Sequence, residues 1–401
     1  MRDLIVVGSG PAGATCARKA ALRGLDVLLL EKSRHPREKL CGGALNPRVP
    51  KALGFDIRPV LDREVHSARI HAPSGRNFLV TNHGLSSYMI RRNRFDSYLV
   101  QKAEEAGAQV IQDSEVVALQ QTRSAVRALC RGDSYESHLL VGADGAEGIV
   151  ARESGIRSSW PPNRMALCMA ADVSMDEADI RKLTAVDGES DELAMEFYLG
   201  TVDWGYGWCF PKAESVCIGI GCRMDRMRNL QVAWMRFLKR INEEKGLSIR
   251  PAVEDTFKVP VGYPEWSLVG RRIMLTGDAA GLASPLTGEG IYYAIVSGSI
   301  AADVSVQAIE SKNAQEVLAF SQRMRKELIP ELESAEFIAR RLMKSTRSLE
   351  IACEVAQKDR IIRDLIIQFV AGSRSAQKSR NSMLKRMLIH HPLESALMGL
   401  G

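Results

Sequence analysis

The 401-residue sequence lacks the features that mark several classes of protein. Its eight cysteines form no C-x-x-C pair and none of its seven histidines lies in a cysteine cluster, so neither a metal site nor a disulfide framework is indicated. No apolar run approaches the roughly 18 residues of a membrane span. The apolar run at residues 4–7 is too short for a signal-peptide core. We therefore expect a reduced, cytoplasmic protein whose membrane contact, where it exists, is peripheral and on the inner face.

Aromatic residues are scarce, at 6%, and they do not alternate with the basic residues. The positive charge is concentrated in residues 340–386, where twelve lysines and arginines accompany four acidic residues. Binding to single-stranded nucleic acid needs aromatic stacking between basic residues, so nucleic acid is not an expected partner. The basic segment is either a solvated helical face or a surface attracted to anionic lipid headgroups.

The sequence does contain a strand, a glycine-rich turn and a helix at its N-terminus. Gly8, Gly10 and Gly13 form G-x-G-x-x-G directly after the apolar residues 4–7, and Glu31 ends the next apolar segment. Such glycines allow a pyrophosphate to approach the helix N-terminus closely, and a carboxylate at Glu31 can accept hydrogen bonds from ribose hydroxyls. The motif predicts a dinucleotide site but does not decide between NAD and FAD.

Two later motifs favour FAD. G-A-D-G at residues 142–145 and L-T-G-D-A-A-G at residues 275–281 both follow apolar segments, and their order resembles that of the FAD-dependent hydroxylase and reductase superfamily. The resemblance implies that Asp278 binds the ribityl chain, a role that suits a carboxylate because it accepts hydrogen bonds from sugar hydroxyls. Asp278 could instead cap a helix. Gly148 stands where that superfamily often has serine.

The same resemblance points to two more contacts with the cofactor. The T-G-E-G loop at residues 287–290 precedes a helix-like segment, so its N–H groups are expected to face the flavin and stabilise the negative charge formed on reduction. Arg92, in R-N-R-F-D, matches an FAD-contacting arginine of the superfamily, although it could also be a surface helix cap. Arg37 and Lys39 are expected either to pair with a phosphate of FAD or substrate or to be solvated loop charges.

Two narrower motifs, K-L-C-G-G-A-L at residues 39–45 and Y-G-W-C-F-P at residues 206–211, resemble the geranylgeranyl reductase family. The resemblance extends over residues 1 to about 330. In that family a Cys-Gly-Gly loop lies near the flavin and the Tyr-x-Trp-x-Phe-Pro motif lines the isoprenoid cavity. The residues that the two resemblances assign to FAD are Gly8, Gly10, Pro11, Ala12, Gly13, Glu31, Lys32, Arg37, Cys41, Gly42, Arg92, Asp144, Gly145, Gly277, Asp278, Pro285, Gly288, Gly290 and Ile291.

The family resemblance also implies the residues that meet the substrate. Tyr206, Trp208 and Phe210 alternate, so on a strand they share one face, and Pro211 would end that strand. They are expected to bind substrate, although an aromatic face can also be ordinary core packing. Cys41 and Tyr206 are the expected catalytic residues, because each could donate a proton to an alkene carbon. Water could serve instead, and Cys41 could simply be a small residue in a tight loop.

The resemblance implies an FAD-dependent reductase that hydrogenates the double bonds of a geranylgeranyl chain on a lipid, a diphosphate, a quinone or a pigment, by hydride transfer from reduced flavin. A flavin monooxygenase or halogenase shares the FAD motifs, but the halogenase pattern W-x-W-x-I-P is only half matched at residues 206–211. A flavin-bearing electron carrier or membrane-docking protein is the alternative from another class. There is no second dinucleotide motif, so the electron donor is expected to be transiently bound NAD(P)H or a ferredoxin-like carrier.

The pattern along the chain predicts an α/β fold, in which a Rossmann-like FAD-binding domain is interleaved with an antiparallel-sheet substrate domain and followed by a C-terminal helical region. The predicted boundaries are 1–62, 91–160 and 261–330 for the FAD-binding domain, 63–90 and 161–260 for the substrate domain, and 331–401 for the helical region. Within that last region we expect a break at Gly372 and a stop at Pro392.

Overall fold

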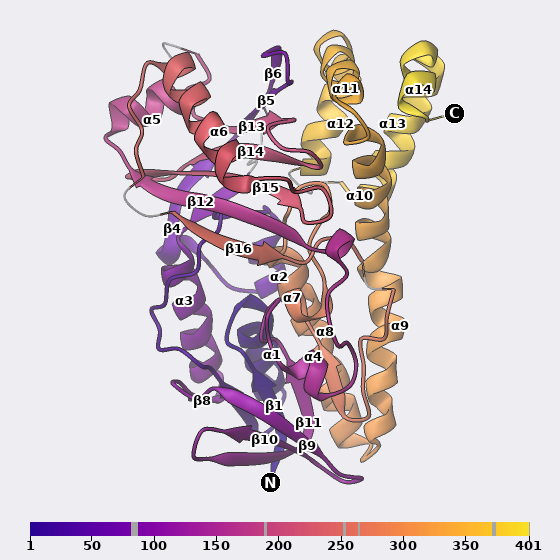
Figure 1. The fold of residues 1–401 in the computed structure, drawn as a ribbon. Coiled ribbons are helices and arrows are strands. Elements are labelled where there is room, and N and C mark those ends of the chain that lie inside the picture. The colour runs from indigo at the N-terminus through magenta and orange to yellow at the C-terminus, as the bar shows by residue number, and fades with distance from the viewer. Residues whose placement is uncertain (82–86, 188–190, 252–253, 264, 371–373, 401) are drawn as a thin grey trace.

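The computed structural model describes residues 1–81, 87–187, 191–251, 254–263, 265–370 and 374–400. It contains a nucleotide-binding part, a second sheet that lies across one end of it, and a run of helices along one side (Figure 1). This arrangement confirms the predicted α/β fold class. The chain passes between the two sheets more than once, so each is assembled from distant segments. The exact domain boundaries stay a prediction.

The first sheet has the strand order β8-β2-β1-β11-β10-β9, and β17 also pairs with β11. Its strands are β1 (Arg2–Val7), β2 (Val27–Leu30), β8 (Gln109–Ile111), β9 (Val116–Gln121), β10 (Val126–Cys130), β11 (Ser134–Gly142) and β17 (Ile273–Leu275). The parallel strands β2 and β17 are entirely buried and apolar, as expected for strands covered on both faces. Helix α1 (Pro11–Leu22) packs against α3 (Arg92–Glu105) and α8 (Ile291–Glu310).

The second sheet has the strand order β16-β12-β15-β14-β13-β5-β6. Its strands are β5 (Ser67–His71), β6 (Asn77–Thr81), β12 (Ala166–Ser174), β13 (Ala194–Leu199), β14 (Gly205–Pro211), β15 (Ser215–Arg223) and β16 (Asp255–Val259). All neighbours are antiparallel except β5 and β13, which are parallel. The predicted antiparallel sheet contains this one parallel pair because the two strands belong to separate excursions of the chain and no hairpin sets their direction.

The two faces of the second sheet have different neighbours. Cys209 of β14 belongs to an apolar cluster with α6 (Leu230–Lys245) and α5 (Glu177–Thr184), whereas Trp208 and Phe210 belong to a cluster with the C-terminal helices. This follows from the alternation of side chains along a strand. The aromatic face of β14 is therefore turned away from α6 and toward the rest of the molecule.

Short elements connect these parts. A small third sheet joins β3 (Ala44–Leu45), β7 (Ser87–Ile90) and β4 (Leu61–Val65) in that order. The remaining short helices are α2 (Val49–Leu53), η1 (Arg58–Val60), α4 (Val150–Glu153), η2 (Pro162–Arg164) and α7 (Gly277–Ala280).

The C-terminal helices run along the side of the molecule to the second sheet, where α11 and α12 contact the edge strand β6 (Figure 1). They are η3 (Ala314–Val317), α9 (Leu318–Glu327), α10 (Ile329–Leu342), α11 (Thr346–Lys358), α12 (Arg360–Val370), α13 (Ala376–His390) and α14 (Pro392–Met398). The expected break at Gly372 lies outside the described residues. The expected stop at Pro392 is only half right, because α13 ends before it but Pro392 then begins α14, where a proline needs no N–H partner. None of the helices in the described ranges is long and apolar enough to cross a bilayer.

Candidate functional site

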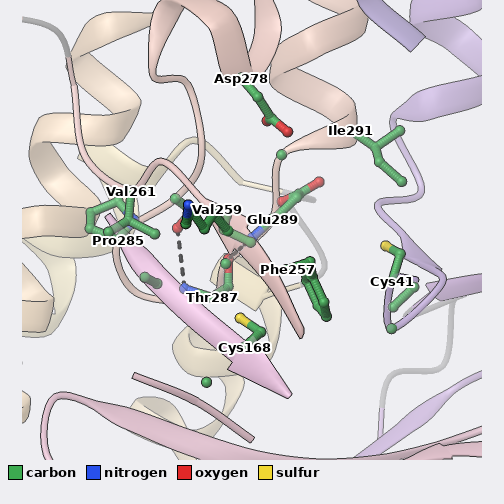
Figure 2. A pocket seen from close by; sticks show the side chains of 18 of the residues that line it. Cys41, Cys168, Phe257, Val259, Val261, Asp278, Pro285, Thr287, Glu289 and Ile291 are labelled. Carbon is green, nitrogen blue, oxygen red and sulfur yellow. Dashed lines mark hydrogen bonds between the residues drawn. The ribbon is translucent and has the colours of Figure 1, made fainter. Parts of the chain in front are cut away.

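A cavity of about 280 Å³ lies between the two sheets and collects residues from most of the predicted motifs. The predicted site residues that line it are Gly10, Pro11, Ala12, Cys41, Gly42, Arg92, Gly145, Tyr206, Trp208, Phe210, Gly277, Asp278, Pro285, Gly288, Gly290 and Ile291. Figure 2 shows Cys41, Asp278 and Ile291 on the side of the nucleotide-binding part. We call this space the first cavity.

The glycine turn has the shape that the close approach of a phosphate requires. Gly8 has a φ of +94°, and a Cβ on Gly13 would lie 1.8 Å from the carbonyl oxygen of Gly8. Helix α1 begins at Pro11 and has no side-chain cap, so its free N–H groups are available at the cavity. Gly8 and Gly13 therefore shape the turn without lining the cavity, while Gly10 lines it.

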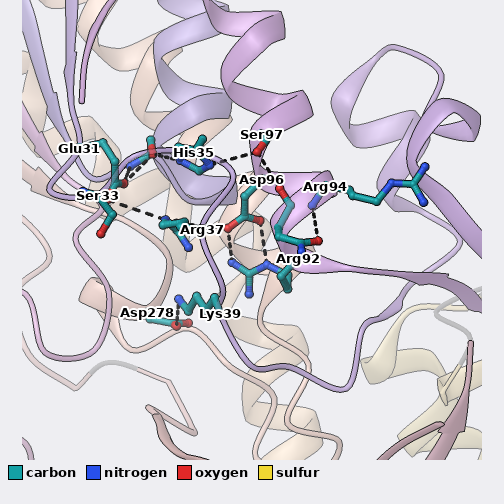
Figure 3. A network of polar contacts seen from close by, with 12 residues as sticks. Glu31, Ser33, His35, Arg37, Lys39, Arg92, Arg94, Asp96, Ser97 and Asp278 are labelled. Carbon is teal, nitrogen blue, oxygen red and sulfur yellow. Dashed lines mark hydrogen bonds and ion pairs between the residues drawn. The ribbon is translucent and has the colours of Figure 1, made fainter. Parts of the chain in front are cut away.

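Glu31 lies beside this turn in the polar network that Figure 3 shows. Its carboxylate accepts hydrogen bonds from the N–H of Ser9 at 2.9 Å, the hydroxyl of Ser9 at 2.6 Å and the N–H of Ser33 at 3.0 Å. Burial opposes its charge, but these hydrogen bonds and the charge of Arg37 hold the pKa of Glu31 below its ordinary value. Glu31 does not line the first cavity, and neither does the exposed Lys32.

Three cations and two carboxylates lie together at one end of the first cavity (Figure 3). Arg92 donates two hydrogen bonds of 2.7 Å to the fully buried Asp96, and Arg37 pairs with the same carboxylate at 3.2 Å. Lys39 Nζ lies 3.9 Å from a carboxylate oxygen of Asp278. When Glu31 is included, which lies 3.8 Å from Arg37, the cations and carboxylates balance, and Lys39 and Arg92 are the cations that line the cavity. The alternative of a surface cap at Arg92 is wrong, because only 7% of its side chain is exposed.

Asp278 faces the first cavity from the start of α7. Helix α7 has no side-chain cap hydrogen bond, so the helix-cap alternative for Asp278 is wrong. A Cβ on Gly290 would lie 3.3 Å from the Asp278 carboxylate, and the glycine leaves that oxygen open. This geometry fits a carboxylate that binds sugar hydroxyls.

Asp144 was expected to bind FAD, but it lies outside the cavity while its neighbour Gly145 lines it. Its carboxylate accepts a hydrogen bond of 2.9 Å from the N–H of Val150 at α4, and burial raises its pKa. A Cβ on Gly148 would lie 2.0 Å from the Asp144 Cγ atom. The glycine that departs from the superfamily pattern is therefore the residue that makes room for Asp144.

The aromatic motif of β14 forms one wall of the first cavity. The ring centroids of Tyr206 and Trp208 lie 6.0 Å apart, those of Trp208 and Phe210 lie 6.3 Å apart, and Phe197 of β13 lies 5.1 Å from Phe210. A Cβ on Gly219 would lie 2.2 Å from the Trp208 ring, so a glycine is needed beneath it. Pro211 ends β14, as expected, and does not line the cavity.

Tyr206 connects this wall to the T-G-E-G loop. Its hydroxyl donates a hydrogen bond to the carbonyl oxygen of Thr287, and burial raises its pKa. A phenol that is already a donor and has a raised pKa is better suited to positioning than to giving up its proton. The wall and the loop are therefore held at a defined separation.

Cys41 lies in the loop between β2 and β3 and is partly exposed. The N–H of Gly43 lies 3.5 Å from its sulfur, and the thiol of Cys217 donates to its carbonyl oxygen at 3.6 Å. Cys168 also lines the cavity, but it is buried and its pKa is raised by that burial. Of these two thiols, Cys41 is the more open to the cavity.

Sequence reasoning missed Glu289, which lines the first cavity within the T-G-E-G loop. Its Oε1 atom is buried without a partner among the described residues, while Oε2 accepts a long hydrogen bond of 3.4 Å from Asn46. Burial raises its pKa to about 7, although Arg48 acts in the opposite direction. The sequence does contain a feature that could have identified it, because Glu289 is the only charged residue between Asp278 and Asp303.

A second, apolar cavity of about 200 Å³ lies beside the first. The two share Phe197, Tyr206, Leu286 and Thr287 as lining residues. The other walls of the second cavity come from β5, β6 and the helices α10 to α14, a set that no single sequence motif predicts.

Comparison with known proteins agrees with this geometry. Residues 1–196 match a family model described as an FAD binding domain. The chain is 30% identical over 342 residues to the digeranylgeranylglycerophospholipid reductase of Methanocaldococcus jannaschii, a match that covers 81% of this chain and 82% of that protein. A geranylgeranyl bacteriochlorophyll reductase-like protein from Thermoplasma acidophilum has a TM-score of 0.82 at 25% identity, covering 100% of this chain and 99% of its own.

The fold is also shared with a flavin-dependent brominase, which has a TM-score of 0.74 at 19% identity and covers 96% of this chain and 98% of its own. That likeness concerns the fold alone. The match to the methanogen reductase extends over most of both chains, and FAD is confirmed as the cofactor. The chain therefore belongs to the geranylgeranyl reductase family of FAD-dependent oxidoreductases.

Proposed function

We propose that this chain hydrogenates the double bonds of geranylgeranyl chains on a lipid. The observation that carries the proposal is the aromatic wall of Tyr206, Trp208 and Phe210, which lines the same cavity as Asp278 and Arg92 and continues into an apolar space. An unactivated alkene offers no polar group to hold, so it must be positioned by packing in a dry cavity. The name of the methanogen relative supports a glycerophospholipid carrier.

The residues around the first cavity would hold FAD. The free N–H groups of α1 and the cations Arg37, Lys39 and Arg92 suit the diphosphate, and Asp278 suits the ribityl hydroxyls. The loop of residues 287–290 lines the same cavity and would lie beside the flavin ring, but the N–H groups of Thr287 and Gly288 already donate to Ser284. When bound and reduced, FAD supplies a hydride to one carbon of the double bond.

The other alkene carbon needs a proton, and Cys41 is the residue we propose to hold it. Its sulfur lines the first cavity and is partly exposed there, so it can regain a proton from solvent after each turnover. Tyr206 would instead position the substrate, since its hydroxyl is engaged with Thr287. One hydride and one proton together account for the two hydrogens gained at each double bond.

Access to lipid would come from the C-terminal helices. Leu388, Ile389, Leu393 and Leu397 are 47 to 77% exposed on α13 and α14, while Met387 and Met398 of the same helices line the second cavity. Exposed apolar side chains beside basic ones favour binding to the surface of an anionic bilayer. The electron donor would be NAD(P)H or a ferredoxin-like carrier that binds transiently.

The direct test is anaerobic incubation of the dithionite-reduced holoprotein with geranylgeranyl lipids, followed by mass spectrometry. Products heavier by successive pairs of hydrogens are expected. No change in mass, together with an oxygen-dependent hydroxylated or halogenated product, would show that the chain is a monooxygenase or halogenase.

A further inference from the structure

Two arginines lie in the wall of the second cavity, Arg341 on α10 and Arg380 on α13. The guanidinium carbon of Arg341 lies 3.4 Å from the centroid of the Phe337 ring, and that of Arg380 lies 5.5 Å from the same centroid. Two helices that are separate in the sequence thus bring two positive charges to one aromatic ring. Among the described residues that line the second cavity, these arginines are the only charged ones.

Neither arginine is neutralised within the part of the chain that the structure describes. Arg341 donates to the carbonyl oxygen of Phe337 at 3.3 Å, and its buried Nε atom has no partner among those residues. Within the same ranges, Arg380 donates only to the Asn381 side chain, at 3.2 and 3.1 Å. Burial without a compensating carboxylate lowers the pKa of Arg341.

Neighbouring arginines on the same two helices are paired. Arg340 lies 2.5 Å from the carboxylate of Glu336, and Arg386 lies 2.7 Å from that of Asp359. Arg341 and Arg380 differ from these two arginines because neither has a carboxylate partner among the described residues. Partly buried cations are costly unless they are paired, and planar guanidinium groups match phosphate oxygens well.

We propose that Arg341 and Arg380 bind the phosphate of an amphiphilic substrate whose isoprenoid chain fills the second cavity and reaches the first. The inference rests on the proposed function, because it assigns the head group of that substrate. The apolar walls select the chain, and the two cations select an anionic head group over a neutral one. Phe197, Tyr206, Leu286 and Thr287 line both cavities, so the chain would pass these residues on its way to Cys41.

The test compares three substrates with the holoenzyme: a geranylgeranylated glycerophospholipid, geranylgeranyl diphosphate and the neutral alcohol geranylgeraniol. In R341Q/R380Q, the KM for the phosphate-bearing substrates should rise roughly 10- to 100-fold, the range for lost hydrogen bonds to a charged group. The KM for geranylgeraniol should stay within about twofold of the parent value, because no phosphate contact is lost. A rise for only one of the two phosphates identifies the physiological head group.

Two further variants serve as controls for this comparison. Lys378→Gln removes an exposed charge from the same helix α13 and should leave all three KM values unchanged. R341K/R380K restores charge without the planar fork and should recover part of the affinity for phosphate. An R341Q/R380Q protein that retains FAD but shows equal KM changes for geranylgeraniol and the phosphates, or none at all, overturns the proposal.

A binding measurement can test the phosphate site independently of the proposed reaction. Calorimetric titration of the oxidised holoprotein with geranylgeranyl diphosphate or geranylgeraniol requires no turnover. If no substrate is reduced but R341Q/R380Q weakens only the binding of the diphosphate, the proposed reaction fails while the phosphate site stands. If the two ligands bind equally well to both proteins, the phosphate site fails whatever the reaction.

Discussion

The two cavities each contain arginine, but they differ in what neutralises it. In the first cavity Arg92 is held by the fully buried carboxylate of Asp96, which also pairs with Arg37. In the second, Arg341 and Arg380 have no carboxylate partner among the described residues. Because an uncompensated buried charge is costly, the first group is complete in the protein alone, whereas the proposal has an anion complete the second.

This difference suits two kinds of ligand. A cofactor that stays bound through many turnovers benefits from a preorganised site, since less side-chain ordering is needed on binding. A substrate that binds and leaves in each turnover supplies the counter-charge only while it is bound. Removing a charge should therefore have different effects in the two groups.

The largest effect is expected for Asp96→Asn, which removes the carboxylate that pairs with the arginines at the first cavity. The substitution leaves Arg92 and Arg37 without their buried carboxylate, so we expect a loss of about 3 kcal/mol or more in the free energy of unfolding and poor retention of FAD. Chemical denaturation and flavin absorbance measure the two effects. Asp113→Asn, at an exposed pair with Arg34, should change stability by less than about 0.5 kcal/mol. Equal effects of the two substitutions would refute a preorganising role for Asp96.

Glu289→Gln tests a buried carboxyl group in the lining of the first cavity, one oxygen of which has no partner among the described residues. The pKa of Glu289 is raised to about 7 in the folded protein, so the stability that its bound proton contributes is complete below the ordinary glutamate pKa and is lost as pH rises toward 7. A glutamine side chain does not titrate. The free energy of unfolding of the variant, relative to that of the parent, should therefore rise by up to about 3 kcal/mol between pH 5 and pH 8. Thermal unfolding of the apoprotein across this range is the measurement, and a difference that does not grow with pH would contradict it.

Cys41→Ala tests whether Cys41 donates the proton in the proposed reaction. Removing a proton donor should lower kcat by roughly 10- to 100-fold while FAD content is unchanged. Cys168→Ala removes another thiol from the same cavity and should lower kcat by less than about threefold, because that thiol is buried and its pKa is raised. If the two alanine variants are equally active, the proton comes from water or another residue.

The smallest effect is expected for the stability of R341Q/R380Q without substrate. Because the two charges have no carboxylate to lose, their removal should change the free energy of unfolding by less than about 1 kcal/mol, in contrast to Asp96→Asn. At the same concentration, geranylgeranyl diphosphate should raise the Tm of the parent more than that of this variant. A loss of more than about 2 kcal/mol in the unliganded variant would mean that the protein itself compensates these arginines.

Local motifs account for most of what could be predicted about the first cavity. The turn at Gly8, Gly10 and Gly13 is set by a strand, a turn and a helix that are contiguous, and the shared face of Tyr206 and Trp208 follows from strand geometry. The pairing of Arg92 with Asp96 was also accessible, because the two are four residues apart in a helix. Each of these features depends on neighbours in the chain.

The sequence left the direction of the side chain open at two positions. Asp144 follows a strand in a G-A-D-G motif, as a cofactor ligand would, yet its carboxylate turns to the N–H of Val150 because Gly148 leaves room for it. Glu289 was overlooked as part of a glycine loop, although a lone carboxylate between apolar segments marks an unusual position. In both cases the direction of the side chain was decided by packing.

The sequence by itself determined the α/β fold, the FAD motifs and the aromatic face of β14, because these depend on short-range periodicity and on the conformational freedom of particular glycines. Only the tertiary structure decided that the helices α10 to α14 close a second cavity against β5 and β6, and that Arg341 and Arg380 meet over Phe337 there. The sequence shows these arginines as two charges in a basic segment. Whether such a charge is solvated, paired or left for a ligand depends on side chains distant in the chain, and therefore on packing.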